Sequence, residues 1–234
     1  ENGNMKKMLI AMTFCMCAVG LIGCYTADSG NYTTDKIHFE FAVDVSATVA
    51  TATASFWTPS AQPANPTYLV LTAGDTITVN GVAMQRVRGP FFDVYTATLQ
   101  PAETYTFTFT RTDGTSYDST VNTIVPLEIT SPAEGDWISR AADLNVTWTN
   151  PIEGGNVAVF VPGGQYFNGF LRETADTGAY TIPANTLTLD AMSPSTDVET
   201  GLSVSRSHKG VMATGLTGNI VARTGNNIAF VSTE

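Results

Sequence analysis

The sequence predicts an all-β protein built from two tandem β-sandwich domains, and three observations lead to this prediction. The chain has 234 residues, which is enough for one or two hydrophobic cores. Threonine occurs 36 times, and this β-branched residue suits a half-exposed strand better than a helix. Short stretches of alternating apolar and polar residues recur between turns rich in Gly, Pro and Asn, which is the pattern of strands.

The N-terminal segment has the pattern of a secretory signal. Met5 and the basic pair Lys6 and Lys7 precede an apolar run over residues 8–22. This run is shorter than the roughly 20 apolar residues that a comfortable membrane span needs. We therefore interpret residues 1–23 as a cleaved signal peptide, in which residues 1–4 are a remnant upstream of the start methionine.

The end of the apolar run carries a specific motif. Leu21, Ile22, Gly23 and Cys24 resemble the lipobox of bacterial lipoproteins, whose cysteine is lipidated and becomes the new N-terminus. The resemblance implies that Cys24 carries a diacylglyceryl group and an N-linked acyl chain such as palmitate, which are enough for stable anchoring. Tyr25, in place of Asp, implies the bacterial outer membrane, on its periplasmic or cell-surface face. An ordinary cleaved signal or a buried helix is the alternative.

A short tether and a first sandwich are expected next. Residues 24–35 show no apolar periodicity, which indicates a flexible tether after the lipidated cysteine. Residues 36–125 form the first domain, because strand alternation begins there and hairpin turns follow at residues 80–81 and 113–114. The core positions are predicted by alternation with polar neighbours: Phe39, Phe41, Val43, Val45, Tyr105, Phe107 and Phe109.

A second domain is predicted over residues 126–234, where the β pattern starts again after Pro126. A strand leads into the turn Ser131–Gly135, and Leu144, Val146 and Trp148 then alternate with polar residues. This order resembles the immunoglobulin-like Ser/Thr-rich cell-wall modules of bacteria and fungi over residues 127–184. The resemblance implies an immunoglobulin-like sandwich, and the alternating pattern places Trp148 in its core. How this domain closes after Ala184 is left open.

Several chemistries are excluded or disfavoured. Cys15, Cys17 and Cys24 are the only cysteines, so the folded part has no disulfide, thiolate nucleophile or cysteine zinc site. A formal net charge of −10 rules out a basic groove for nucleic acid. His38 is interpreted as a residue on the polar face of a strand and His208 as a loop residue. No catalytic motif is present, so we predict no enzyme and no cofactor.

Carboxylates leave two weaker alternatives. Glu40 with Asp44, or Asp113 with Asp118, could cleave a glycoside if folding brought them to the right separation. Asp136 and Asp143 flank one loop, where a calcium ion could bind. Surface charges that aid solubility explain the two pairs equally well, and no calcium-binding pattern is present, so we predict no metal.

Aromatic residues near turns are the candidate ligand-binding residues. They are Trp57, Trp137, Tyr166, Phe167 and Phe170. Planar side chains of this kind can stack on sugar rings or anchor a protein partner, although packing of a loop against the core is the alternative. The sequence therefore predicts a membrane-anchored, non-catalytic interaction module for adhesion or scaffolding, with a protein or glycan ligand. A carbohydrate-binding or hydrolytic lipoprotein is the alternative.

Overall fold

The chain folds almost entirely into β-strands, which confirms the predicted all-β class. The computed structural model describes residues 26–59, 66–89, 92–165 and 167–234. In these ranges the helical elements are two short 3-10 turns, Ser29–Asn31 and Thr34–Lys36. The strands are β1 (Thr26–Asp28), β2 (His38–Val45), β3 (Ala50–Thr58), β4 (Thr67–Val70), β5 (Thr76–Val79), β6 (Val82–Ala83), β7 (Gln85–Arg88), β8 (Asp93–Leu99), β9 (Thr104–Thr110), β10 (Ser116–Asn122), β11 (Ile129–Ser131), β12 (Trp137–Ser139), β13 (Leu144–Trp148), β14 (Asn156–Val161), β15 (Phe170–Ala175), β16 (Ala179–Ile182), β17 (Val198–Lys209) and β18 (Thr217–Thr233).

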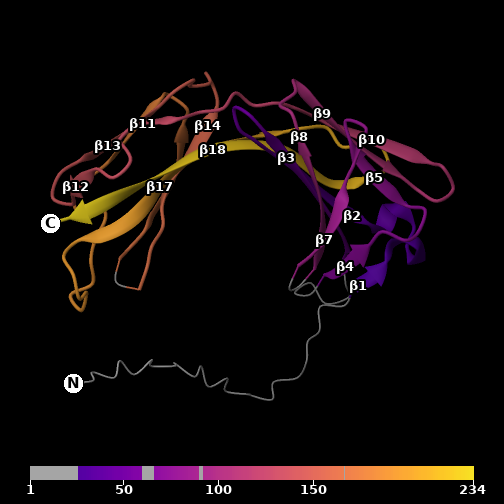
Figure 1. The fold of residues 1–234 in the computed structure, drawn as a ribbon, viewed down its shortest axis with the longest axis horizontal. Coiled ribbons are helices and arrows are strands. Elements are labelled where there is room, and N and C mark those ends of the chain that lie inside the picture. The colour runs from indigo at the N-terminus through magenta and orange to yellow at the C-terminus, as the bar shows by residue number, and fades with distance from the viewer. Residues whose placement is uncertain (1–25, 60–65, 90–91, 166) are drawn as a thin grey trace, which may run out of the picture.

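The strands form three sheets arranged as an arch (Figure 1). An 11-stranded sheet has the main order β1-β4-β3-β2-β18-β17-β14-β15, with β7, β8 and β12 paired to it off this path. A four-stranded sheet, β10-β9-β5-β6, and a three-stranded sheet, β11-β13-β16, complete the fold. In Figure 1 both smaller sheets lie on the outer side of the arch, so the long sheet lines its inner side.

The first core lies between the long sheet and the four-stranded sheet. Side chains of a strand alternate between its two faces, and the predicted residues Phe39, Phe41, Phe107 and Phe109 are each at most 1% exposed. The two predicted hairpins are also confirmed. β5 pairs with β6 and β9 with β10, and Gly81 has a φ of 77°, which suits the Asn-Gly turn of a hairpin.

The second core lies between the three-stranded sheet and the other half of the long sheet. It contains Leu144, Val146 and Trp148 from the alternating stretch that the sequence singled out. Trp148 is 4% exposed, which confirms its predicted place in the core. The hairpin of β17 and β18 closes this half, which answers how the chain continues after Ala184.

One strand belongs to both halves. The first part of β18 pairs in parallel with β2, and Ile220 and Ala222 pack in the first core. The remainder pairs with β17, and Phe230 packs in the second core. The molecule therefore has two cores, and a single continuous sheet joins them.

The segment predicted as a tether differs from that expectation where it is described. Thr26–Asp28 pairs with β4 as strand β1, and Ser29 is fully buried. The Ser29 hydroxyl donates a hydrogen bond of 2.6 Å to Asp75 Oδ2, and Arg111 Nη1 lies 3.1 Å from the same oxygen. Hydrogen bonds to a buried, paired carboxylate hold the segment against the first sandwich, and polar composition alone does not reveal such partners.

Candidate functional site

The long sheet leaves one face turned away from both cores, and we call this the open face. It carries Trp57 of β3, His38 and Glu40 of β2, and Asn219 and Arg223 of β18, which alternate with core residues on the same strands. In Figure 1 this sheet, with β18 in yellow, follows the inner side of the arch. The candidate site is built on this face.

Aromatic rings form a row across neighbouring strands at one end of the open face. Tyr68 of β4 lies opposite Trp57, and Trp57 lies opposite His38. The ring centroids of Trp57 and His38 are 4.1 Å apart, and Tyr68 stacks on Phe92 at 4.2 Å with the planes 9° apart. All four residues are half-buried, so packing holds them while part of each side chain remains accessible.

A polar cluster adjoins this aromatic row. His38 Nε2 lies 2.8 Å from Glu40 Oε1, and Asn219 Nδ2 donates a hydrogen bond of 3.1 Å to the same oxygen. The Glu40 side chain is 42% exposed, so a ligand can reach its carboxylate. A fixed carboxylate beside rigid rings can accept hydrogen bonds from hydroxyl groups while the rings provide an apolar contact.

The other predicted aromatic residues lie elsewhere. Trp137 is on β12 and is 68% exposed. Phe167 is 5% exposed and packs in the second core, so its side chain does not face a ligand. For this residue the alternative interpretation, a loop that packs against the core, is the correct one. Phe170 is half-buried and stacks on Tyr180 at 5.9 Å. No ring contact joins these residues to Trp57 in the described part of the chain.

Two predicted positions, Tyr166 and Cys24, fall outside the described residues.

The calcium candidates Asp136 and Asp143 each accept a backbone hydrogen bond of 2.8 Å, from Ala133 and Ala184 respectively. Across the ranges that the structure describes, no group of three or more His, Cys, Asp or Glu side chains is placed to hold a metal ion. Each of the two aspartates therefore has a structural partner.

Sequence reasoning selected Trp57 but missed Tyr68, Phe92 and Asn219. Tyr68 lies in a stretch that the strand pattern does predict. Its place beside Trp57 depends on the register between β3 and β4, and Asn219 reaches Glu40 across a sequence separation of 179 residues. Alternation shows which face a residue occupies, but not which distant strand lies beside it.

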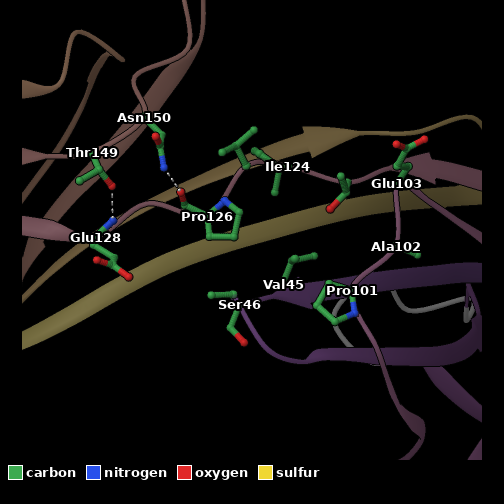
Figure 2. Close-up of a pocket in the computed structure, with 13 residues that line it drawn as sticks. Val45, Ser46, Pro101, Ala102, Glu103, Ile124, Pro126, Glu128, Thr149 and Asn150 are labelled. Atoms are coloured by element: carbon green, nitrogen blue, oxygen red, sulfur yellow. Dashed lines mark hydrogen bonds between the residues drawn. The ribbon is translucent and has the colours of Figure 1, made fainter.

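A separate pocket of about 750 Å³ lies where the two halves of the molecule meet (Figure 2). Apolar residues such as Val45, Pro101 and Ile124 line much of it. The link between the halves is fixed there, because Asn150 Nδ2 donates a 2.9 Å hydrogen bond to the Pro126 carbonyl oxygen. This pocket has no aromatic residue in its lining, so it lacks the rings that distinguish the open face.

Neither a family model nor a curated protein matches the chain. Two of the solved structures that match the chain do so with low TM-scores. One is the Bacteroides ovatus mixed-linkage glucan utilization locus protein SGBP-B in complex with a mixed-linkage heptasaccharide, at 11% identity and a TM-score of 0.22, covering 85% of this chain and 61% of that one. This chain thus spans less than two thirds of that protein. The other is DIP-gamma IG1+IG2, at 8% identity and a TM-score of 0.20, covering 84% and 98%.

Proposed function

We propose that the protein is a non-catalytic, membrane-anchored module that binds a glycan on the open face. The observation that supports this most directly is the row of Tyr68, Trp57 and His38 across adjacent strands, with Glu40 hydrogen-bonded beside it. Adjacent strands lie about 4.8 Å apart, so this row spans about 10 Å. Aromatic rings across this width, next to fixed polar groups, suit a sugar ring, which has an apolar face and hydroxyl groups at its edge.

Replacing Trp57 with alanine tests the proposal. We expect the affinity for a bound polysaccharide to fall about 30-fold, since a central aromatic contact typically contributes about 2 kcal/mol. Affinity electrophoresis in gels that contain xylan, mannan, laminarin or dextran measures this loss. Circular dichroism checks that the variant remains folded.

Trp137→Ala is the matched control, because Trp137 is a more exposed tryptophan on a different strand. We expect this variant to bind as the wild type does. Binding that depends on Trp137 and not on Trp57 would place the ligand elsewhere. A wild-type protein that is not retarded by any of the four polysaccharides contradicts glycan binding.

The membrane anchor at Cys24 is part of the same proposal, with the outer membrane as the location. In the described part of the chain, no helix has the length and apolar character needed to cross a bilayer. Thr26 already belongs to strand β1, and Cys24 precedes it by two residues, which reach at most about 7 Å. Lipidation would therefore hold the edge of the first sandwich close to the lipid surface.

Cys24→Ser is expected to move the protein from the membrane fraction to the soluble fraction. The reason is that acyl chains contribute about 0.8 kcal/mol per buried CH₂ group, and serine cannot form the thioether that carries them. Cell fractionation followed by immunoblotting measures the change, and mass spectrometry of the wild-type N-terminus identifies the lipid. A serine variant that stays with the membrane shows that another anchor exists.

A further inference from the structure

The open face has a second polar site at the point where the two cores meet. A hollow of about 430 Å³ lies there, and both halves of the molecule contribute to it. Asp44 and Thr51 come from β2 and β3, whereas Ser203 and Asn227 come from β17 and β18. Its lining thus combines a carboxylate, hydroxyls and a carboxamide, which offer both donors and acceptors of hydrogen bonds.

Two side chains in this hollow have hydrogen-bonding capacity that no described neighbour uses. Arg223 lies opposite Asp44 in the register of β18 with β2, yet neither side chain forms an ion pair with any described residue. Both side chains are exposed, so a ligand hydroxyl can reach the guanidinium donors of Arg223 and the carboxylate oxygens of Asp44.

The charges of the hollow indicate the class of ligand. Arg223 and Asp44 are its two charged residues, and their opposite charges balance. The whole chain carries a formal net charge of −10, which repels a polyanion. Balanced charge together with several hydroxyls favours an uncharged ligand that is rich in hydroxyl groups.

The hollow and the polar cluster beside the aromatic row both include residues of β18. Asn219, beside the aromatic row, and Arg223 are four residues apart on β18, and Arg223 and Asn227 are a further four apart. At about 3.3 Å per residue, each step covers about 13 Å. One extended chain lying along β18 can therefore contact both places.

We infer that the hollow is a second subsite for the same glycan, so that the ligand is an uncharged polysaccharide rather than a short sugar. This inference rests on the proposed function. Arg223 and Asn227 contact units of the chain that lie beyond the aromatic row. Binding at two linked places raises the affinity for long chains above that for short ones.

The test measures how affinity depends on the length of the oligosaccharide, in the wild type and in a substituted variant. The probes are xylo-, manno-, laminari- and isomalto-oligosaccharides of about two to about eight units, for which we expect the affinity of the wild type to rise at least about tenfold with length. In the double variant Arg223→Ala/Asn227→Ala this rise is expected to disappear, while the affinity for the disaccharide stays unchanged. Isothermal titration calorimetry measures both, and Arg172→Ala, an exposed arginine on β15, is the matched control.

Each outcome decides between the two proposals. A wild type whose affinity does not change with length, or a double variant that keeps the rise, overturns the second subsite but leaves the aromatic site intact. Tighter binding of polygalacturonate than of the neutral chains overturns the assignment of an uncharged ligand. If Trp57→Ala retains full affinity for every oligosaccharide, the proposed function itself fails.

Discussion

Replacing Asp176 with alanine is expected to lower the free energy of unfolding by about 3–5 kcal/mol, because it leaves a buried charge without its partner. Asp176 is 4% exposed, and so is Arg206. Asp176 Oδ2 lies 3.1 Å from Arg206 Nη1, and Oδ1 accepts a hydrogen bond of 2.8 Å from Trp148 Nε1. The alanine variant removes both interactions from the second core.

Within the described residues, Asp176 is the one carboxylate that forms an ion pair with Arg206. Burial lowers the pKa of Arg206, and the charge of Asp176 opposes that shift. Without Asp176 the guanidinium keeps only neutral acceptors, the carbonyl oxygens of Asn150 at 2.7 Å and Thr149 at 3.3 Å. A charged donor with neutral acceptors in a dry site does not recover its lost hydration.

Urea denaturation monitored by circular dichroism measures the loss of stability. Two further variants serve as comparisons. Asp176→Asn keeps an oxygen for the Trp148 indole but loses the charge, so we expect a smaller loss than for alanine. Asp35→Ala removes an exposed carboxylate whose partner, Lys36, is also exposed, and exposed pairs contribute little. A loss for Asp176→Ala no larger than that for Asp35→Ala would contradict the buried pair's role.

The local parts of this fold could be predicted from the sequence. Alternation of Phe39 and Phe41 with His38 and Glu40 identifies both faces of β2, because the side-chain period of a strand is two residues. The Asn-Gly turn before Val82 likewise identifies a hairpin, because both residues accept positive φ. Signals of this kind depend on neighbours in the sequence.

The parts that depend on distant pairing could not be predicted. The parallel pairing of β18 with β2 joins residues about 180 positions apart in the chain, and nothing in the composition around Ile220 indicates it. Docking of Ser29 depends on Asp75, and the aromatic row depends on the register between Tyr68 and Trp57. The sequence therefore indicated that Trp57 is a candidate, but not which groups surround it.

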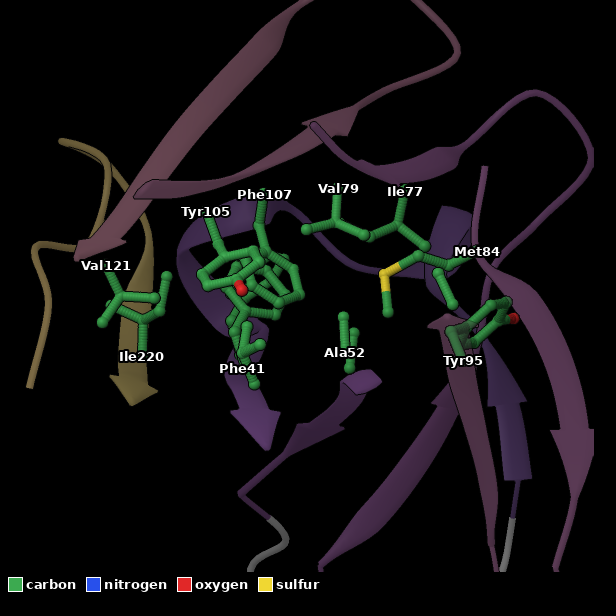
Figure 3. Packing of buried hydrophobic residues seen from close by; sticks show 14 of the residues in the cluster. Phe41, Ala52, Ile77, Val79, Met84, Tyr95, Tyr105, Phe107, Val121 and Ile220 are labelled. Carbon is green, nitrogen blue, oxygen red and sulfur yellow. The ribbon is translucent and has the colours of Figure 1, made fainter. Parts of the chain in front are cut away.

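Phe41→Ala is expected to lower the free energy of unfolding by about 3–5 kcal/mol, the usual cost of emptying a buried phenylalanine site. Phe41 is 1% exposed, and its ring stacks on that of Phe107 with the centroids 4.8 Å apart (Figure 3). Its strand partner on β18 is Ile220, a residue of the same core. The cavity thus opens where β18 enters the first sandwich.

Because β18 is shared, this loss should reach the second core as well. Trp148 reports on that core, and a background with Trp57→Phe and Trp137→Phe leaves it as the single tryptophan. We expect the midpoint of its fluorescence transition in urea to fall together with the midpoint of circular dichroism when Phe41→Ala is added. Val49→Ala, at an exposed position, should move neither midpoint.

The alternative is that each sandwich unfolds by itself. In that case Phe41→Ala would leave the Trp148 transition where it was and split the circular dichroism curve into two steps. The register argues against this, since unfolding the first core frees Ile220 and Ala222 and removes the parallel partner of residues 217–223. The rest of β18 would then keep its strand pairing with β17 and β12 and its packing in the second core. A coincident transition therefore measures how strongly one strand couples the two cores.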